Sequence, residues 1–342
     1  MSDIALLVLD RPDAETVRRI GQLTRRALAA DEFDSLSEHK RMELAAAASA
    51  AAAVAPNDDQ SGDDGREPPG SGGREGFAAV LARRHGHPGL VGYAQVSRTG
   101  GEGGEGGGYG IELVVDPEFR DPVHGVADSL LGTALDRAAH LASRVGAGPV
   151  TVRYWAPRAS PFHDRLAESH GLLPERDLLQ MRRPLPVDDS HRTSVVATRP
   201  FRPGADEPGW LRANNRAFAS HPEQGQWDLS TMLEREGEPW FDSAGLLIHE
   251  EGGQVAASCW TKVHTDVDPP MGEIYVISVD PDFHGRGLGR ALTLAGLDHL
   301  ADEGLTVGML YVDGDNAAAV SLYRSLGFVE HHVDRAYVAT VG

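Results

Sequence analysis

A short stretch around residue 285 combines glycine and arginine in a way that suits binding of a phosphate group. It reads DPDFHGRGLGRALT, from Asp280 to Thr293. Backbone N–H groups at the start of a helix have no partner within the helix, and the helix dipole adds positive charge there. Glycine lets an anion approach the backbone closely. We therefore predict a phosphate-binding loop, to which Arg286 and Arg290 add positive charge.

The spacing of the glycines excludes two common phosphate-binding motifs. A dinucleotide fingerprint that began at Gly285 would require glycine at position 290, where the chain has arginine. A P-loop requires G-x-x-x-x-G-K-[ST], and the sequence contains no such string. The pattern that remains is His284-x-x-Gly287-x-Gly289. Taken alone, this pattern is as compatible with an ordinary glycine-rich turn as with a ligand site.

A second group of residues with helical spacing follows the loop. Asn316, Ala319 and Tyr323 stand at i, i+3 and i+7, and so they share one face of a helix. The helix would begin after the capping residues DGDN and end at Gly327. A tyrosine hydroxyl on such a face can donate a proton or a hydrogen bond to a ligand. The alternative for Tyr323 is a half-buried core residue.

A strand, a loop and a helix must position these residues. The run EIYVISV, residues 273–279, is rich in β-branched residues and predicts a buried strand before the loop. Leucines at helical spacing from residue 288 to residue 300 predict the helix after it. Glu273, at the start of the strand, is the carboxylate that the sequence places best for acid–base chemistry. Its alternative is a solvated residue at the end of a strand.

The two halves of the chain repeat one another. The segment IELVVDPEF at residues 111–119 resembles YVISVDPDF at 275–283, and LAESHGL at 166–172 resembles LYRSLGF at 322–328. A chain of 342 residues also suggests roughly two domains at ~150 residues each. We therefore predict a mixed α/β fold built from two tandem copies of one domain.

The expected boundaries follow from changes in composition. The predicted parts are an N-terminal domain at residues 1–183, a disordered insertion at 56–76, a glycine-rich loop at 100–108, a linker at 184–193 and a C-terminal catalytic domain at 194–342.

Charge and cysteine content restrict the partners and the compartment. The formal net charge is −19, which argues against nucleic acid and anionic membranes as partners. The single cysteine, Cys259, allows no internal disulfide and favours a reducing compartment. No apolar run is long enough for a membrane span, no secretory signal is visible, and no metal-binding motif occurs. We expect a cytoplasmic, monomeric protein without a metal ion.

The two motifs together resemble the GNAT superfamily of acyl-CoA N-acyltransferases. That superfamily shows V-x-P-x-x-[QR]-x-x-G-x-[GA] and then N-x-x-[AS]-x-x-x-Y-x-x-x-G-F. The strings here are V-D-P-D-F-H-G-R-G-L-G and N-A-A-A-V-S-L-Y-R-S-L-G-F. His284 departs from the pattern, since glutamine or arginine is usual there. It leaves the backbone donors of the loop intact but puts a side-chain contact to the ligand in doubt.

The resemblance implies that acetyl-CoA is the co-substrate and that it binds along the strand, the loop and the following helix. Its expected contacts are Ile277, Ser278, Val279, His284, Gly285, Arg286, Gly287, Leu288, Gly289, Arg290, Asn316 and Ala319. Attack of an amine on a thioester needs a base, a polarised carbonyl and a stabilised leaving thiolate. The resemblance implies that Glu273 is the base, that Tyr323 donates to the departing sulfur and that the Val279 N–H polarises the carbonyl.

A closer resemblance covers nearly the whole chain. The segments MRRPL, AFASHPEQGQW, EPWFD, WTKVH, GEIYVISVDP and AYV resemble the mycothiol synthase family, a tandem-domain branch of the superfamily. This resemblance implies acetylation of the cysteinyl amine of a cysteinyl-glucosaminyl-inositol pseudodisaccharide by direct transfer. The implied substrate contacts are Glu38, Glu223, Lys262, Glu273 and Tyr311. For Glu38 and Lys262, an ordinary surface charge is nearly as compatible with the sequence.

The N-terminal half lacks the residues that would carry the chemistry. When the halves are aligned on Asp-Pro, Tyr109 stands at the position of Glu273, and alignment on the later glycine places Ala167 at that of Tyr323. We therefore predict a degenerate N-terminal domain.

Its phosphate loop is altered as well. Gly125 and Ala127 follow two residues late, and Asp128 replaces Arg290. A degenerate cofactor site would lie along Leu113, Val114 and Val115.

Two other functions remain open at this point. One is acetylation of a different amine, such as a peptide N-terminus or an aminoglycoside. The other is a non-catalytic acyl-CoA sensor, which the presence of both Glu273 and Tyr323 disfavours.

Overall fold

The computed structural model describes residues 3–31, 33–53, 76–99, 107–188, 190, 196–219, 225–265 and 267–342. Most of the insertion and of the glycine-rich loop predicted above lies outside the described residues, and so does Glu223. The chain divides into two compact units, Met1–Arg176 with Asp334–Gly342, and Asp177–Val333. The sequence-based boundary at residues 184–193 concerns the repeat and stays a prediction.

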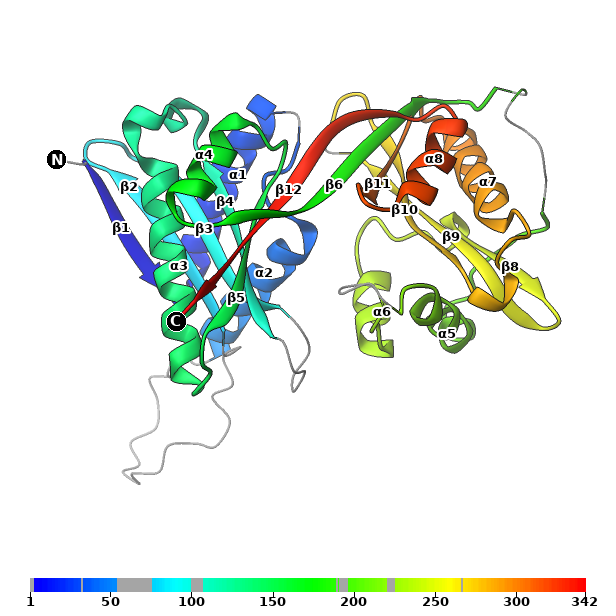
Figure 1. Cartoon of the computed structure of the whole chain (residues 1–342), viewed down its shortest axis with the longest axis horizontal. Helices are drawn as coiled ribbons and strands as arrows, with labels where there is room; N and C mark the ends of the chain where they lie inside the picture. Colours follow the sequence, from blue (N-terminus) through cyan, green and yellow to red (C-terminus); the bar gives the residue numbers. More distant parts are fainter. Residues whose placement is uncertain are drawn as a thin grey trace. The chain divides into compact units, whose positions relative to one another are not determined.

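The first unit is a mixed sheet with helices on both faces (Figure 1). Its elements are β1 (Ile4–Leu9), α1 (Ala14–Asp31), α2 (Glu38–Ala53), β2 (Phe77–Arg84), β3 (Leu90–Thr99), β4 (Gly108–Val115), η1 (Pro117–Phe119), η2 (Pro122–His124), α3 (Val126–Arg144), β5 (Val150–Ala156) and α4 (Pro161–Ser169). The sheet order is β1-β2-β3-β4-β5, and only β4 and β5 run parallel. Helices α1 and α2 bury one apolar face, whereas α3 and α4 bury the other.

The second unit repeats this plan. Its elements are β7 (Arg199–Pro200), α5 (Glu207–Ala217), α6 (Leu229–Glu236), η4 (Ser243–Gly245), β8 (Leu246–Glu251), β9 (Gln254–His264), β10 (Met271–Val279), η5 (Pro281–Phe283), α7 (Leu288–Asp302), β11 (Val307–Asp313) and α8 (Ala317–Ser325). The order is β11-β10-β9-β8-β7, and only β10 and β11 run parallel. The predicted mixed α/β fold is thus confirmed in both units.

The last strand of each sequence repeat joins the sheet that the other repeat forms. These two strands are β6 (Leu173–Pro184) and β12 (Val329–Val341). Residues 178–184 of β6 pair with β11 in the second unit, and residues 335–341 of β12 pair with β5 in the first unit. The repeat in the sequence therefore does not coincide with the compact units, because pairing is decided by the register between distant strands.

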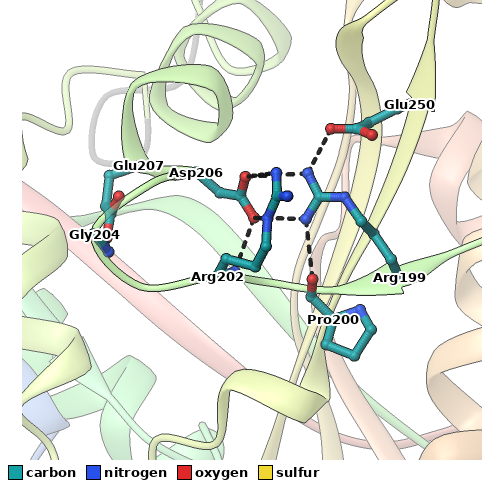
Figure 2. Close-up of polar contacts among 7 residues, drawn as sticks. All are labelled: Arg199, Pro200, Arg202, Gly204, Asp206, Glu207 and Glu250. Carbon is teal, nitrogen blue, oxygen red and sulfur yellow. Dashed lines mark hydrogen bonds and ion pairs between the residues drawn. The ribbon is translucent and has the colours of Figure 1, made fainter.

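An ion-pair network centred on the buried Asp206 joins the start of α5 to the sheet of the second unit (Figure 2). Asp206, just before α5, accepts hydrogen bonds from the guanidinium groups of Arg199 on β7 and Arg202, at 2.5 Å and 2.9 Å. Arg199 also contacts Glu250 on β8. Burial by itself would raise the pKa of Asp206, but the bonds from Arg202 and Arg199 outweigh it and lower the pKa strongly. The network thus fixes the position of α5, which packs against β9 and β10.

Candidate functional site

The glycine-rich stretch forms the predicted turn before a helix. Gly285 and Gly287 both have a φ of +76°, in the left-handed region that favours glycine. A Cβ at either position would meet no heavy atom within 4 Å, so backbone conformation and not space requires glycine. Gly287 caps α7 and has no side chain to occupy the first N–H groups of the helix. These amides can therefore donate hydrogen bonds to an anionic ligand.

The basic side chains around this turn have partners of their own. Arg286 donates to Glu251 at 2.7 Å, and its guanidinium lies 5.1 Å from the centre of the Phe283 ring. Arg290 donates to the Ser325 hydroxyl on α8 at 2.8 Å. The charge of Arg286 is thus paired with a carboxylate, whereas the hydroxyl that Arg290 contacts is neutral. Arg290 therefore adds positive charge to that of the backbone amides and the α7 dipole.

His284, which departs from the family motif, is tied to the strand before the turn. Its Nε2 lies 3.0 Å from the backbone oxygen of Val279. The ring thus braces the end of β10. A role for this side chain in binding a ligand stays a prediction.

Strands β10 and β11 separate beside the turn. Residues Gly272–Ile274 pair with Gly308–Leu310, and the pairing ends there. Asp280 donates its N–H to Ala256 on β9. Because successive residues of a strand direct their N–H groups to opposite edges, the N–H groups of Ile277 and Val279 face the opening. The opening therefore offers backbone donors and acceptors to an extended ligand.

Ser278 lies between the two residues whose N–H groups face the opening, so its own N–H points to β9. Its hydroxyl lies 2.8 Å from that of Ser258 on β9, and the residue is buried. The side chain thus belongs to the sheet and not to the ligand site.

Glu273 lies on the sheet face that α5 and α6 cover, and it is almost buried. The residue is 7% exposed. Its Oε2 lies 2.7 Å from Nε2 of His264, and its direct partner across the strands is Lys262. No role was predicted for His264. The only signal for it was its spacing of two residues from Lys262 on a predicted strand, which places both side chains on one face.

Lys262 is not an ordinary surface charge. The residue is 8% exposed, and its ammonium lies 4.4 Å from the ring centre of Trp240 and 5.4 Å from that of Tyr275. Trp240 in turn packs against Trp260, which contacts Trp210 of α5. The aromatic faces stabilise a buried cation. The arrangement holds a positive charge directly across the strands from the Glu273 carboxylate.

Tyr323 is buried on α8 and remains protonated at neutral pH. It is 6% exposed, and burial raises its pKa, with a smaller effect from Cys259. Within the described part of the chain its hydroxyl has no hydrogen-bond partner, so the proton is available to a ligand. Asn316 caps the same helix, since its Oδ1 accepts the N–H of Ala319 at 3.1 Å. The predicted cap is thus confirmed.

The loop, the end of β10 and α8 converge at Gly289. A Cβ there would lie 3.9 Å from both Val279 and Leu322. The structure therefore brings together the elements that carry the two motifs, and the roles of the individual residues stay a prediction.

The other predicted substrate residues are placed only in part. Tyr311, on β11, is 38% exposed, and its hydroxyl accepts a hydrogen bond from Gln180 at 2.8 Å. Glu38 begins α2 in the first unit, and its side chain is outside the described part of the structure, as is Glu223.

The first unit has a different residue at the position of Glu273 from the one expected. Strand β10 has a register shift between Ile274 and Val276, and the β3–β4 pair has none in this region. The extra residue in β10 changes the alignment by one position. Glu273 on β10 is the register partner of Lys262 on β9, and Gly110 on β4 is the register partner of Ser97 on β3. When β9 is matched to β3 residue by residue, Lys262 corresponds to Ser97, and Glu273 therefore corresponds to Gly110. The expectation that Tyr109 replaces Glu273 is therefore wrong.

A lysine from a helix occupies this part of the first unit. A Cβ at Gly110 would lie 3.2 Å from the Lys40 ammonium. That ammonium donates to the Gly110 oxygen at 3.1 Å and contacts Ser97. The first unit therefore has an ammonium, and not a carboxylate, at this position. Ala167 does occupy the helical position of Tyr323, as expected, and is fully buried.

The turn before α3 keeps part of the loop geometry. Gly125 caps α3 with a φ of +65°, so the left-handed glycine is retained. Arg120 donates to the Val115 oxygen, as His284 bonds to that of Val279. Asp128 replaces Arg290 and lies 3.0 Å from His170. β4 and β5 pair only through Tyr109–Glu112 and Val152–Trp155, so Leu113, Val114 and Val115 also border an opening.

Among the described residues, no group of three or more histidine, cysteine, aspartate or glutamate side chains could hold a metal ion. In the same part of the chain, none of the helices combines the length and the apolar character that a membrane crossing requires.

Comparison with known sequences agrees with this geometry. A family model described as Acetyltransferase (GNAT) family matches residues 210–328. The chain is 42% identical over 334 residues to a mycothiol acetyltransferase from Geodermatophilus obscurus, with 95% of each chain covered. It is 47% identical over 231 residues to a protein of the same name from Thermobispora bispora, covering 66% of this chain and 74% of that one.

Solved structures extend the likeness to both units. A GCN5-related N-acetyltransferase from Sphaerobacter thermophilus matches with a TM-score of 0.65 at 21% identity, covering 99% of this chain and 96% of that one. A tandem GNAT protein from the clavulanic acid biosynthesis pathway matches with a TM-score of 0.62 at 17% identity, covering 99% of both chains. The likeness concerns the fold, and it confirms the predicted pair of tandem GNAT domains.

Proposed function

Because the chain belongs to the mycothiol acetyltransferase family of GNAT enzymes and is an acetyl-CoA-dependent N-acetyltransferase of mycothiol biosynthesis, we propose that its second unit acetylates the cysteinyl amine of cysteinyl-glucosaminyl-inositol. The observation that carries the proposal is a nearly buried carboxylate, Glu273, on the strand that leads into the amide-lined turn before α7. A carboxylate suits removal of a proton from an amine, and the turn suits a pyrophosphate.

The residues around the turn fit acetyl-CoA. The backbone amides at the start of α7 would hold the pyrophosphate, and the open edge of β10 at Ile277 and Val279 would bind the amides of the pantetheine arm. Acetyl-CoA supplies an activated thioester when bound. Asn316 and Ala319 shape the start of α8 beside the same turn.

Each step of the transfer has a candidate group. Glu273 takes a proton from the cysteinyl ammonium, so that the neutral amine can attack the thioester carbon. The N–H of Val279 stabilises the negative charge that develops on the carbonyl oxygen. Tyr323 donates its proton to the departing sulfur, and the C–S bond breaks as the C–N bond is completed. The new amide nitrogen then loses its extra proton, which restores the Tyr323 hydroxyl. Transfer is direct, within a ternary complex, and no residue of the chain is acylated.

The substrate side requires several polar groups for a polyol. We assign this role to Glu38, Glu223, Lys262 and Tyr311. Lys262 supports the assignment, because a caged cation beside Glu273 orders that carboxylate and can meet a sugar oxygen. The enzyme would act in the cytoplasm as a monomer, which sedimentation of the purified protein and fractionation of cells would test.

Mass spectrometry tests the substrate. The protein would be incubated with acetyl-CoA and the cysteinyl pseudodisaccharide beside a panel of other amines, including a peptide N-terminus and an aminoglycoside. We expect a gain of one acetyl group on the cysteinyl amine only. Acetylation of another amine with none on the pseudodisaccharide would contradict the substrate. Binding of acetyl-CoA without any transfer would favour a sensor.

A further inference from the structure

We propose that His264 positions Glu273 and accepts the proton that Glu273 removes from the substrate amine. The inference deepens the proposed function and rests on Glu273 as the base. His264 would be a positioning residue, since it reaches the substrate only through the carboxylate.

The contact is specific in its geometry. His264 Nε2 lies 2.7 Å from Glu273 Oε2, and the two side chains are 23% and 9% exposed. His264 is the register partner of Met271, two residues before Glu273, so the pair is a diagonal contact across β9 and β10 on one face of the sheet. With Oε2 bound to the ring, Oε1 is left to meet the amine. The more exposed imidazole provides a route from the buried carboxylate to solvent.

The proton balance explains why a second group is useful. A free α-amine ordinarily has a pKa of ~8, an imidazole ~6.5 and a glutamate ~4.3, so a carboxylate alone is a weak acceptor. In the proposed step the Nε2–H of a neutral His264 donates to Oε2 of the carboxylate, the ammonium loses a proton to Oε1 of Glu273, and that proton passes through water to Nδ1 of His264. The product is a carboxylate beside an imidazolium, which then releases its proton to water. No oxidant, metal or further reactant is needed.

The other charged groups around Glu273 do not replace His264 in this role. Lys262 on β9 is held between aromatic rings, and Tyr311 on β11 is bonded to Gln180. Arg182 on β6, the register partner of Met309, is a permanent cation and cannot accept a proton. From α5, Arg216 pairs with Asp280 and Asp282 at the far end of β10. Among the described groups on this face, His264 is the one that can both bond to the carboxylate and accept its proton.

The first unit supports the coupling of the two residues. At the strand positions of Glu273 and His264 it has Gly110 and Thr99. The unit without the carboxylate thus also lacks the imidazole.

The test compares His264→Ala, His264→Gln and Glu273→Gln with the wild type across pH 5–9. A glutamine at 264 can keep a hydrogen bond to the carboxylate but cannot take up a proton. We expect the affinity for acetyl-CoA to stay within about twofold for all variants, since the turn is untouched. We expect kcat to fall by roughly 10- to 100-fold in His264→Ala. His264→Gln should recover part of that loss, and its acidic limb of kcat should move to lower pH.

The outcomes separate this inference from the proposed function. Wild-type kcat and pH dependence in both His264 variants would overturn the inference, provided that Glu273→Gln is inactive. A His264→Gln enzyme identical to the wild type across pH would overturn the proton transfer. Full activity of Glu273→Gln would instead refute the proposed function itself. Circular dichroism identifies a variant that fails to fold, and His264→Gln is the safer substitution for that reason.

Discussion

The same strand pair carries different side chains in the two units. In the second unit, β9 and β10 present Lys262, His264 and Glu273 on one face. At the matching positions of β3 and β4, the first unit has Ser97, Thr99 and Gly110, and Lys40 reaches in from α2. The backbone frame, with its parallel pair that opens beside a glycine-capped helix, is common to both. The difference shows that the shared backbone arrangement does not by itself supply the acid–base side chains.

The largest expected effect is loss of turnover in Glu273→Gln. Without a base, kcat should fall about 10²- to 10⁴-fold, because the substrate ammonium can no longer be deprotonated in the complex. The matching residue of the first unit, Gly110, has no side chain to alter, so Tyr109→Phe beside it is the control and should keep wild-type turnover. Steady-state kinetics with the pseudodisaccharide would measure both, and calorimetry should show retained binding of acetyl-CoA. An equal fall of kcat in the two variants would contradict the prediction that only the second unit carries the catalytic base.

Tyr323→Phe tests the second group that the first unit lacks. Phenylalanine keeps the packing against Phe328 but removes the proton donor, so kcat should fall roughly 10- to 100-fold with little change in stability. The loss should shrink for an acyl donor whose thiol is more acidic, because such a thiolate needs less help to leave. An unchanged rate with acetyl-CoA would exclude Tyr323 as the donor.

One aspartate in each unit should contribute to stability with an opposite dependence on pH. The pKa of Asp206 is strongly lowered in the folded second unit, whereas burial raises the pKa of Asp334 in the first unit to about 6. A lowered carboxyl pKa stabilises the fold above the unfolded value of ~3.9, and this stability is lost as pH falls. A raised pKa has the opposite sign, so its stability is lost as pH rises from about 4 to about 6.

Urea unfolding of Asp206→Asn and Asp334→Asn would measure this contrast. Asp206→Asn should cost about 1–2 kcal/mol at pH 7 and less near pH 3, because a buried carboxylate loses its charged hydrogen bonds to two partly exposed arginines. Asp334→Asn should keep the bond from the Arg158 N–H and should remove the loss of stability between pH 4 and pH 6. The same pH dependence in both variants would show that neither aspartate controls its unit.

The smallest expected effects come from the two capping glycines. Gly287→Ala and Gly125→Ala each place a side chain in the left-handed region without a clash, so each should cost about 1 kcal/mol of stability. Only Gly287→Ala should also weaken binding of acetyl-CoA, by a few-fold to tenfold, since it stiffens the turn that holds the pyrophosphate. Equal weakening by both variants would mean that the first unit still binds the co-substrate.

Much of the second unit could be read from short segments of the sequence. The strand from Glu273 to Val279, the left-handed glycine at 287 and the cap at Asn316 each follow from local requirements. Such features depend on the residues next to them in the chain, so a single sequence suffices to predict them. The repeat likewise revealed two copies of one fold.

Only the tertiary structure decided how distant strands align. The extra residue in β10 places Gly110, and not Tyr109, opposite the position of Glu273. The bond between His264 and Glu273, the aromatic rings around Lys262 and the exchange of β6 and β12 also depend on register and packing between segments far apart in sequence. Those energies are absent from any local pattern, since a shift of one residue in register moves every side chain to the other face.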